Sequence, residues 1–127
     1  MSVLRTVTAG LGAAALLATP LALATATPAS AAERQFRCAG SPVDFEVEKD
    51  DGRYEVDVDL DGRRGDQWRI TLRQDGGVFY NQVRRVDADG DIDVDRTRPN
   101  TAGRDVFKLT VKKIGGPAAC SSTIAFR

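Results

Sequence analysis

The residue types that carry most enzyme chemistry are unevenly represented in this chain. It contains 18 acidic residues, 18 basic residues and two cysteines, but no histidine. Histidine is the usual general base, the usual activator of a serine or cysteine nucleophile and a frequent zinc ligand. Its absence from the sequence therefore excludes Ser-His and Cys-His relays and imidazole-ligated zinc.

Carboxylates are numerous enough to supply the pair of acids that glycoside hydrolysis requires. Such a pair must face a substrate across a cleft, whereas a small β-domain fills its interior with core side chains. Acids that alternate with apolar residues along a strand usually serve to solvate it. We therefore predict no catalytic residue and no enzymatic activity for this chain.

Two aspartate-rich segments resemble calcium-binding loops. Residues 57–62 read Asp-Val-Asp-Leu-Asp-Gly, like the opening of an EF-hand loop, but the twelfth position is Trp68 in place of a bidentate glutamate. Ordinary Asp-Gly turn chemistry accounts for both segments, so we predict no dedicated metal site. The alternative is a looser Ca²⁺ site formed by Asp59, Asp61 and Asp66, or by Asp87, Asp89 and Asp91.

Cys38 and Cys120 are separated by 82 positions and predict a structural disulfide that ties the first strand to the last. The chain-entropy model gives such a bridge about 4.5 kcal/mol of stabilisation at most. The alternative is a pair of redox-active thiols. It is disfavoured because the spacing is not C-x-x-C.

The beginning of the chain indicates export, where a disulfide can persist. Met1–Arg5 provides a positively charged start, Val7–Thr25 is apolar, and residues 29–31 form a small-residue cleavage pattern. The proline and the many weakly apolar residues in this stretch argue against the alternative, a membrane anchor. We predict that residues 1–31 are a signal peptide, that residues 32–127 form one domain, and that the protein is secreted.

The elements that position these groups follow from the periodicity of the remaining chain. Apolar and polar residues alternate with a period of two, and the runs are separated by Gly, Asp and Pro, while no helical pattern occurs. This pattern predicts an all-β fold, a single antiparallel β-sandwich of seven or eight strands, with a small barrel as the alternative. The predicted strands cover residues 43–48, 53–60, 68–73, 78–86, 91–96, 106–112 and 119–126.

A family resemblance rests on two segments. Residues 67–76 read Gln-Trp-Arg-Ile-Thr-Leu-Arg-Gln-Asp-Gly, and Thr-Ala-Gly at 101–103 precedes Phe-Lys-Leu-Thr-Val at 107–111. They resemble the C strand, and the E–F corner with the F strand, of immunoglobulin-like sandwiches, which implies that Trp68 is the core tryptophan. The cysteines depart from the antibody pattern, because they lie outside strands B and F, and no tyrosine corner is present.

Composition adds a second resemblance. The Ala-rich leader and the preference for Arg over Lys and for Asp over Glu are similar to those of small secreted actinobacterial proteins without an assigned function. This resemblance implies a secreted β-sandwich but no particular partner.

The outward faces of the predicted strands differ in charge. We assign residues 43–48, 53–60 and 91–96 to one sheet, whose solvent face carries acids against Arg53 alone. The other sheet exposes basic side chains on strands 68–73 and 106–112, with two more arginines on the strand between them. The acids are Asp44, Glu46, Glu48, Glu55, Asp57, Asp59, Asp91, Asp93 and Asp95, and the predicted ligand-binding bases are Arg69, Arg73, Arg84, Arg85, Lys108 and Lys112.

These charges lead to the functional hypotheses. We expect a secreted non-catalytic module that binds an extracellular polymer or protein, such as cell-wall material, through the basic face. The alternative is an inhibitor of a secreted hydrolase that presents loop 62–67 or loop 96–104, including Arg63-Arg64 or Arg98-Pro99. A third hypothesis is self-association of unlike faces, and the fourth is that the charges only solvate the strands. Nucleic-acid binding is disfavoured, because threonines take the place of stacking aromatics.

Overall fold

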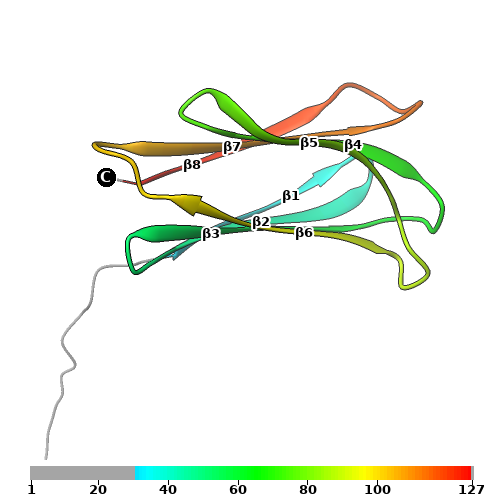
Figure 1. Cartoon of the computed structure of the whole chain (residues 1–127). Coiled ribbons are helices and arrows are strands. Elements are labelled where there is room, and N and C mark those ends of the chain that lie inside the picture. The colour runs from blue at the N-terminus through cyan, green and yellow to red at the C-terminus, as the bar shows by residue number, and fades with distance from the viewer. Residues whose placement is uncertain (1–30, 127) are drawn as a thin grey trace, which may run out of the picture.

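The computed structural model describes residues 31–126, which form a β-sandwich of two antiparallel four-stranded sheets (Figure 1). The predicted all-β class is confirmed. The predicted signal peptide lies outside the described residues except for Ala31, the first residue of strand β1 (Ala31–Cys38). Within residues 31–126, no helix is long and apolar enough to span a membrane.

The eight strands divide evenly between the two sheets. One sheet has the order β1-β2-β3-β6 and the other has the order β5-β4-β7-β8, as the two layers of Figure 1 show. The predicted assignment of strands 43–48, 53–60 and 91–96 to one sheet is therefore confirmed. The bounds are β1 Ala31–Cys38, β2 Ser41–Asp50, β3 Arg53–Asp61, β4 Gln67–Gln74, β5 Gly77–Arg85, β6 Asp91–Pro99, β7 Asp105–Lys113 and β8 Cys120–Phe126.

Strand β1 is the one strand that the periodicity did not locate. It pairs along its whole length with β2, from Ala31 opposite Glu48 to Cys38 opposite Ser41. Because β1 is an edge strand, most of its side chains are exposed or only half-buried, so its sequence lacks a clear apolar alternation. It is the eighth strand of the seven or eight that we predicted.

The core lies between the two sheets and consists of the apolar residues of the alternating pattern. Phe45, Tyr54, Trp68 and Phe107 are all fully buried there. The rings of Tyr54 and Phe107, which belong to different sheets, meet edge to face with centroids 4.9 Å apart. The prediction that Trp68 lies in the core is confirmed.

Tight turns connect consecutive strands at the predicted positions. Asp51 and Gly52 join β2 to β3, and Asp75 and Gly76 join β4 to β5, with all four residues at positive φ. Two-residue hairpin turns with positive φ favour Asp followed by Gly, because Gly has no Cβ and Asp tolerates the left-handed region. These turns fix the register that places every second side chain on one sheet face.

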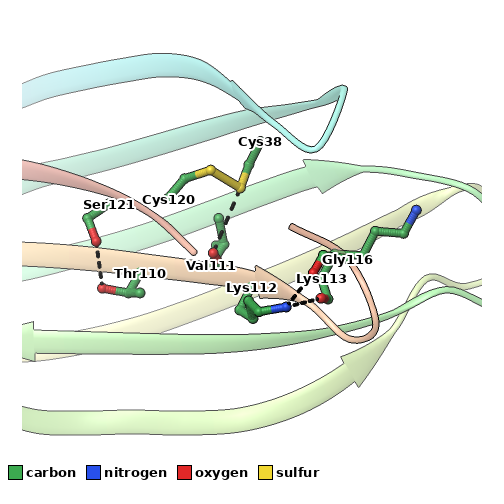
Figure 2. Close-up of a disulfide and its surroundings, with 8 residues drawn as sticks. All are labelled: Cys38, Thr110, Val111, Lys112, Lys113, Gly116, Cys120 and Ser121. Atoms are coloured by element: carbon green, nitrogen blue, oxygen red, sulfur yellow. Dashed lines mark hydrogen bonds between the residues drawn. A yellow bond between two sulfur atoms is a disulfide. The ribbon is translucent and has the colours of Figure 1, made fainter. Parts of the chain in front are cut away.

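The predicted disulfide is present and joins the sheets covalently (Figure 2). Cys38 ends β1 and Cys120 begins β8, and their Cα atoms are 5.9 Å apart. Both strands are edge strands of their sheets, so the bond closes one flank of the sandwich. The prediction that a disulfide joins the first strand to the last is confirmed.

A buried carboxylate links the sheets a second time. Asp105 at the start of β7 accepts hydrogen bonds from the Tyr54 hydroxyl at 3.1 Å, from Gln74 Nε2 at 3.1 Å and from the Thr101 hydroxyl. Burial alone would raise the pKa of Asp105, but these hydrogen bonds outweigh it and hold the pKa below its ordinary value. The same contacts fix the connection between β6 and β7.

Candidate functional site

The outer face of the β1-β2-β3-β6 sheet is covered with carboxylates, and we call it the acidic face. Every second residue of these strands points away from the core, and in the central rows nearly all of them are acids. Arg37 and Arg53 lie at the two ends of this face. The acids are Glu33, Asp44, Glu46, Glu48, Asp50, Glu55, Asp57, Asp59, Asp61, Asp91, Asp93 and Asp95.

The strand register places like charges directly opposite one another on the acidic face. One row crosses all four strands as Glu33, Glu46, Asp57 and Asp95, each the Cα partner of the next. Cross-strand partners of like charge destabilise a sheet. The other opposed pairs are Asp44 with Asp59, Asp59 with Asp93, Glu48 with Glu55, and Asp61 with Asp91.

This crowding raises the pKa of several carboxyl groups. Partial burial and repulsion from Asp95 raise the pKa of Asp57 to about 6, and burial with repulsion from Asp61 raises that of Asp59. A hydrogen bond to Asp44 raises the pKa of Glu33. Among residues 31–126 the one ion pair joins Lys113 to Asp66, at 3.3 Å, so no internal cation neutralises the acidic face.

The acidic face is hollowed in two adjoining places. The larger hollow has a volume of about 440 Å³ and the smaller about 220 Å³, and both are bordered by Asp44 and Asp59. Asp44 Oδ1 is shielded from solvent and accepts no hydrogen bond within the described part of the chain. The larger hollow combines apolar, acidic and other polar side chains with one cation, and its lining residues are Gln35, Phe36, Arg37, Pro42, Val43, Asp44, Asp59 and Asp61.

The aspartates predicted for a looser Ca²⁺ site do not form either of the two predicted groups of three. Oxygens of Asp59, Asp61 and Asp91 lie within 4.8 Å of one another, because β3 and β6 pair at this point. Asp66 is instead paired with Lys113. Asp87 Oδ1 accepts hydrogen bonds from the backbone N–H of Asp89 at 2.9 Å and of Asp91 at 3.3 Å, as an Asp-Gly turn requires.

The outer face of the β5-β4-β7-β8 sheet carries the opposite charge, and we call it the basic face. Arg69 on β4 lies opposite Lys112 on β7, and Arg73 lies opposite Lys108. Thr71 and Thr110 form the row between these two pairs. No carboxylate occupies an outward position on these four strands, so sheet pairing concentrates positive charge here.

The predicted place of Arg84 and Arg85 between the two basic strands is wrong. Strand β4 pairs directly with β7, and β5 lies at the outer edge of the sheet. Arg84 is the cross-strand partner of buried Trp68, so it projects toward the open flank between the sheets and donates to the Tyr80 hydroxyl at 2.9 Å. Arg85 stays on the basic face and donates to the Gly65 carbonyl at 3.3 Å.

Two more basic side chains are held by contacts within the protein. Lys112 Nζ donates to the carbonyl oxygens of Lys113 and Gly116, both at 2.9 Å, and so braces the turn before β8 (Figure 2). Arg69 Nη1 donates to Asn81 Oδ1 at 2.8 Å. Within residues 31–126, no side-chain hydrogen bond or ion pair engages Arg73 or Lys108, so these two cations form the available centre of the basic face.

The two loops predicted for an inhibitor, 62–67 and 96–104, differ in whether their arginines are exposed to solvent. Loop 62–67 is fixed by backbone hydrogen bonds such as Gly65 N to Val86 O at 3.0 Å, and Arg63 and Arg64 project from it into solvent. Arg98 does not project outward. Its guanidinium lies 4.6 Å from the centre of the Phe79 ring and donates to Gln74 Oε1 at 3.0 Å.

Sequence reasoning missed the contribution of β1 to the acidic face. Glu33, Gln35 and Arg37 are exposed while Phe36 is half-buried and Cys38 is buried, and this short alternation at the end of the strand was the signal that could have located it. Gln35 Nε2 donates to Asp44 Oδ2 at 3.4 Å and thereby joins β1 to the face.

Comparison with protein-family models, with curated proteins and with solved structures found no match for this chain.

Proposed function

We propose that this protein is a secreted, non-catalytic β-sandwich module that binds an anionic extracellular polymer through the basic face. The observation that carries the proposal is the pair Arg73 and Lys108, two opposed cations without a side-chain hydrogen bond or ion pair among residues 31–126. Placing like charges side by side costs stability and leaves both of them unneutralised. An anionic ligand that lies across β4 and β7 would relieve this repulsion.

Neighbouring hydroxyl groups extend the proposed binding surface toward β8. Ser121 is the cross-strand partner of Thr110, and exposed Thr123 is the partner of Lys108. Cations interleaved with hydroxyl groups suit a polymer that carries phosphate or carboxylate groups on a hydroxylated chain. The lack of aromatic side chains in this row favours a glycan-type or polyol-type polyanion over a nucleic acid.

The proposal also includes secretion of the protein and the absence of catalytic activity. A disulfide is compatible with an oxidising compartment. The hollows border the acidic face, whose crowded carboxylates would repel a polyanionic substrate.

The finer resemblance to immunoglobulin-like sandwiches is part of the same proposal. The order β5-β4-β7-β8 is similar to the C′-C-F-G order of such domains, with Trp68 on the strand equivalent to C. The other sheet departs from that pattern, because its third strand, β3, precedes the C-like strand in the chain. The resemblance thus supports a binding scaffold and identifies no partner.

The test measures binding of the secreted protein to polyphosphate and to polygalacturonate, with dextran as the neutral polymer. We expect binding to both polyanions but not to dextran, with an affinity that falls steeply as salt rises. The double variant Arg73→Gln/Lys108→Gln should bind about tenfold more weakly or worse. The control Arg34→Gln/Arg53→Gln removes two charges from the other sheet and should change the affinity less than about twofold.

Equal losses in the two double variants would show that net charge, and not the basic face, governs the interaction. Salt-independent binding, or no binding to either polyanion, would contradict the proposal.

A second candidate function is supported by loop 62–67. Its backbone is fixed by hydrogen bonds while Arg63 and Arg64 remain exposed, which is the arrangement of an inhibitor that presents a basic side chain to a protease pocket. This candidate predicts stoichiometric inhibition of a secreted trypsin-like protease, abolished in Arg63→Ala/Arg64→Ala. Intact protease activity at excess protein would eliminate it for proteases of that specificity.

A further inference from the structure

The two charged faces lie on opposite sides of one rigid sandwich. The acidic face covers the β1-β2-β3-β6 sheet and the basic face covers the β5-β4-β7-β8 sheet, which form the two layers of Figure 1. The formal charge of the whole chain is zero, so neither face reflects an overall excess of one sign. The molecule therefore carries two complementary surfaces that cannot meet within a single copy.

The hollow on the acidic face matches the exposed lysine at the centre of the basic face. Phe36 and Pro42 give the hollow an apolar part, and the three carboxylates of Asp44, Asp59 and Asp61 outnumber the one cation that also lines it, Arg37. A lysine side chain has an apolar stem and a cationic head, so it suits such a mixed lining. The three carboxylates would attract its ammonium group.

From this complementarity we propose that the protein associates head to tail, with the basic face of one copy docked on the acidic face of a second copy and Lys108 entering the hollow beside Asp59. The proposal goes beyond polymer binding and does not require it. Unlike faces form a heterologous contact, which leaves one free face of each kind and permits further addition. A polyanion would compete with the second copy for the basic face.

The size of the faces sets the strength of this association. Four strands spaced about 4.8 Å apart, each contributing about eight residues at 3.3 Å, present roughly 500 Å² per face. Contacts of about 1,000 Å² in total fall in the weak, transient class. We therefore expect concentration-dependent, reversible association in which charge dominates, strong at an ionic strength of about 0.01 M and absent at about 1 M.

Charge reversal of each face separately gives a sharp test. Lys108→Glu disables the basic face and keeps the acidic face, whereas Asp59→Lys does the opposite. Each reversal replaces a like-charge pair with an opposite-charge pair, because Lys108 lies opposite Arg73 and Asp59 lies opposite Asp44 and Asp93, so both variants should fold. Fluorescence of Trp68, the chain's one tryptophan, verifies the fold of each.

The measurement is sedimentation velocity of each variant alone and of an equimolar mixture at low salt. The wild type should form species that grow with concentration, each variant alone should be monomeric, and the mixture should regain association, because the unaltered basic face of Asp59→Lys meets the unaltered acidic face of Lys108→Glu. Persistent self-association of either variant would overturn the assignment of faces. A monomeric wild type, or a mixture that stays monomeric, would overturn the proposal.

Polymer binding is measured separately and distinguishes the two proposals. Asp59→Lys retains the basic face, so it should bind polyphosphate at least as well as the wild type while no longer self-associating. If the wild type does not bind polyphosphate but the two variants associate in the mixture, the self-association proposal holds and the polymer-binding proposal fails.

Discussion

Asp57 shows at a single residue what the acidic face costs the fold. It lies between Glu46 and Asp95 in the cross-strand register, and its carboxyl pKa is raised to about 6. A carboxylate in this position is ionised at neutral pH against the repulsion of its neighbours. The position is therefore unfavourable for stability, which points to a use of the surface charge.

The substitution Asp57→Asn should stabilise the protein. It removes one repulsive charge at neutral pH and preserves side-chain size, and because Asp57 is largely solvated we expect only about 0.5 kcal/mol. Urea denaturation monitored by Trp68 fluorescence measures the gain. Asp51→Asn, which lies in a turn off the acidic face at a positive φ that Asn tolerates, is the matched control and should be nearly neutral. Destabilisation by Asp57→Asn would contradict the repulsion account.

Among the strands, the sequence predicted best those whose inner residues are fully buried. In β2, β3, β4 and β7 the apolar residues recur at every second position because one side of each strand meets the core. The turns next to these strands, the sheet to which each strand belongs and the disulfide were also predicted from the residue types and their spacing. Strand β1 was missed because an edge strand buries too little surface to impose a clear pattern.

Side-chain partners were less predictable than strands. The sequence shows that Arg84 and Arg85 are adjacent, but it does not show that one of them faces the flank with Tyr80 and the other faces solvent. The register of β5 against β4 decides which of the two faces the flank, because Arg84 pairs with inward-facing Trp68, and register depends on long-range pairing. For the same reason, the grouping of Asp59 and Asp61 with Asp91 needed the β3–β6 register.

The disulfide should be the strongest single constraint at the level of elements. It joins the edge strands β1 and β8 and closes a loop of 82 positions, so Cys38→Ala/Cys120→Ala should lose about 4 kcal/mol of unfolding free energy. Chemical denaturation of both proteins, with and without reductant, measures this loss. Reductant should lower the stability of the wild type alone. Equal stability of the two proteins without reductant would show that the bond is dispensable.

For the whole molecule, the opposing carboxylates predict an unusual dependence of stability on pH. Asp57 has a folded pKa of about 6 against an ordinary 3.8, so between these values the folded state binds more protons than the unfolded state. This contribution makes stability increase as pH falls from about 6 toward 3.8. The lowered pKa of Asp105 acts in the opposite direction, because its stabilising contribution is lost as pH falls below 3.8 through the folded value.

The expected result is a melting temperature that rises by about 3–5 °C on mild acidification from neutral pH and then falls in stronger acid. Calorimetry across this range measures the profile. Asp57→Asn should reduce the rise, whereas Asp105→Asn should be less stable at neutral pH and show a smaller fall in acid. A melting temperature that decreases steadily from neutral pH downward would contradict the assignment of these groups.

Binding by the basic face is the central claim, and residue-resolved NMR tests it most directly. Titration of the ¹⁵N-labelled protein with polyphosphate, at a protein concentration low enough to keep the protein monomeric, should shift the amide signals of Arg73, Lys108, Thr110 and Thr123, while those of Asp57 and Asp59 stay in place. Shifts confined to loop 62–67 or to β2 and β3, or no shifts at all, would contradict the account.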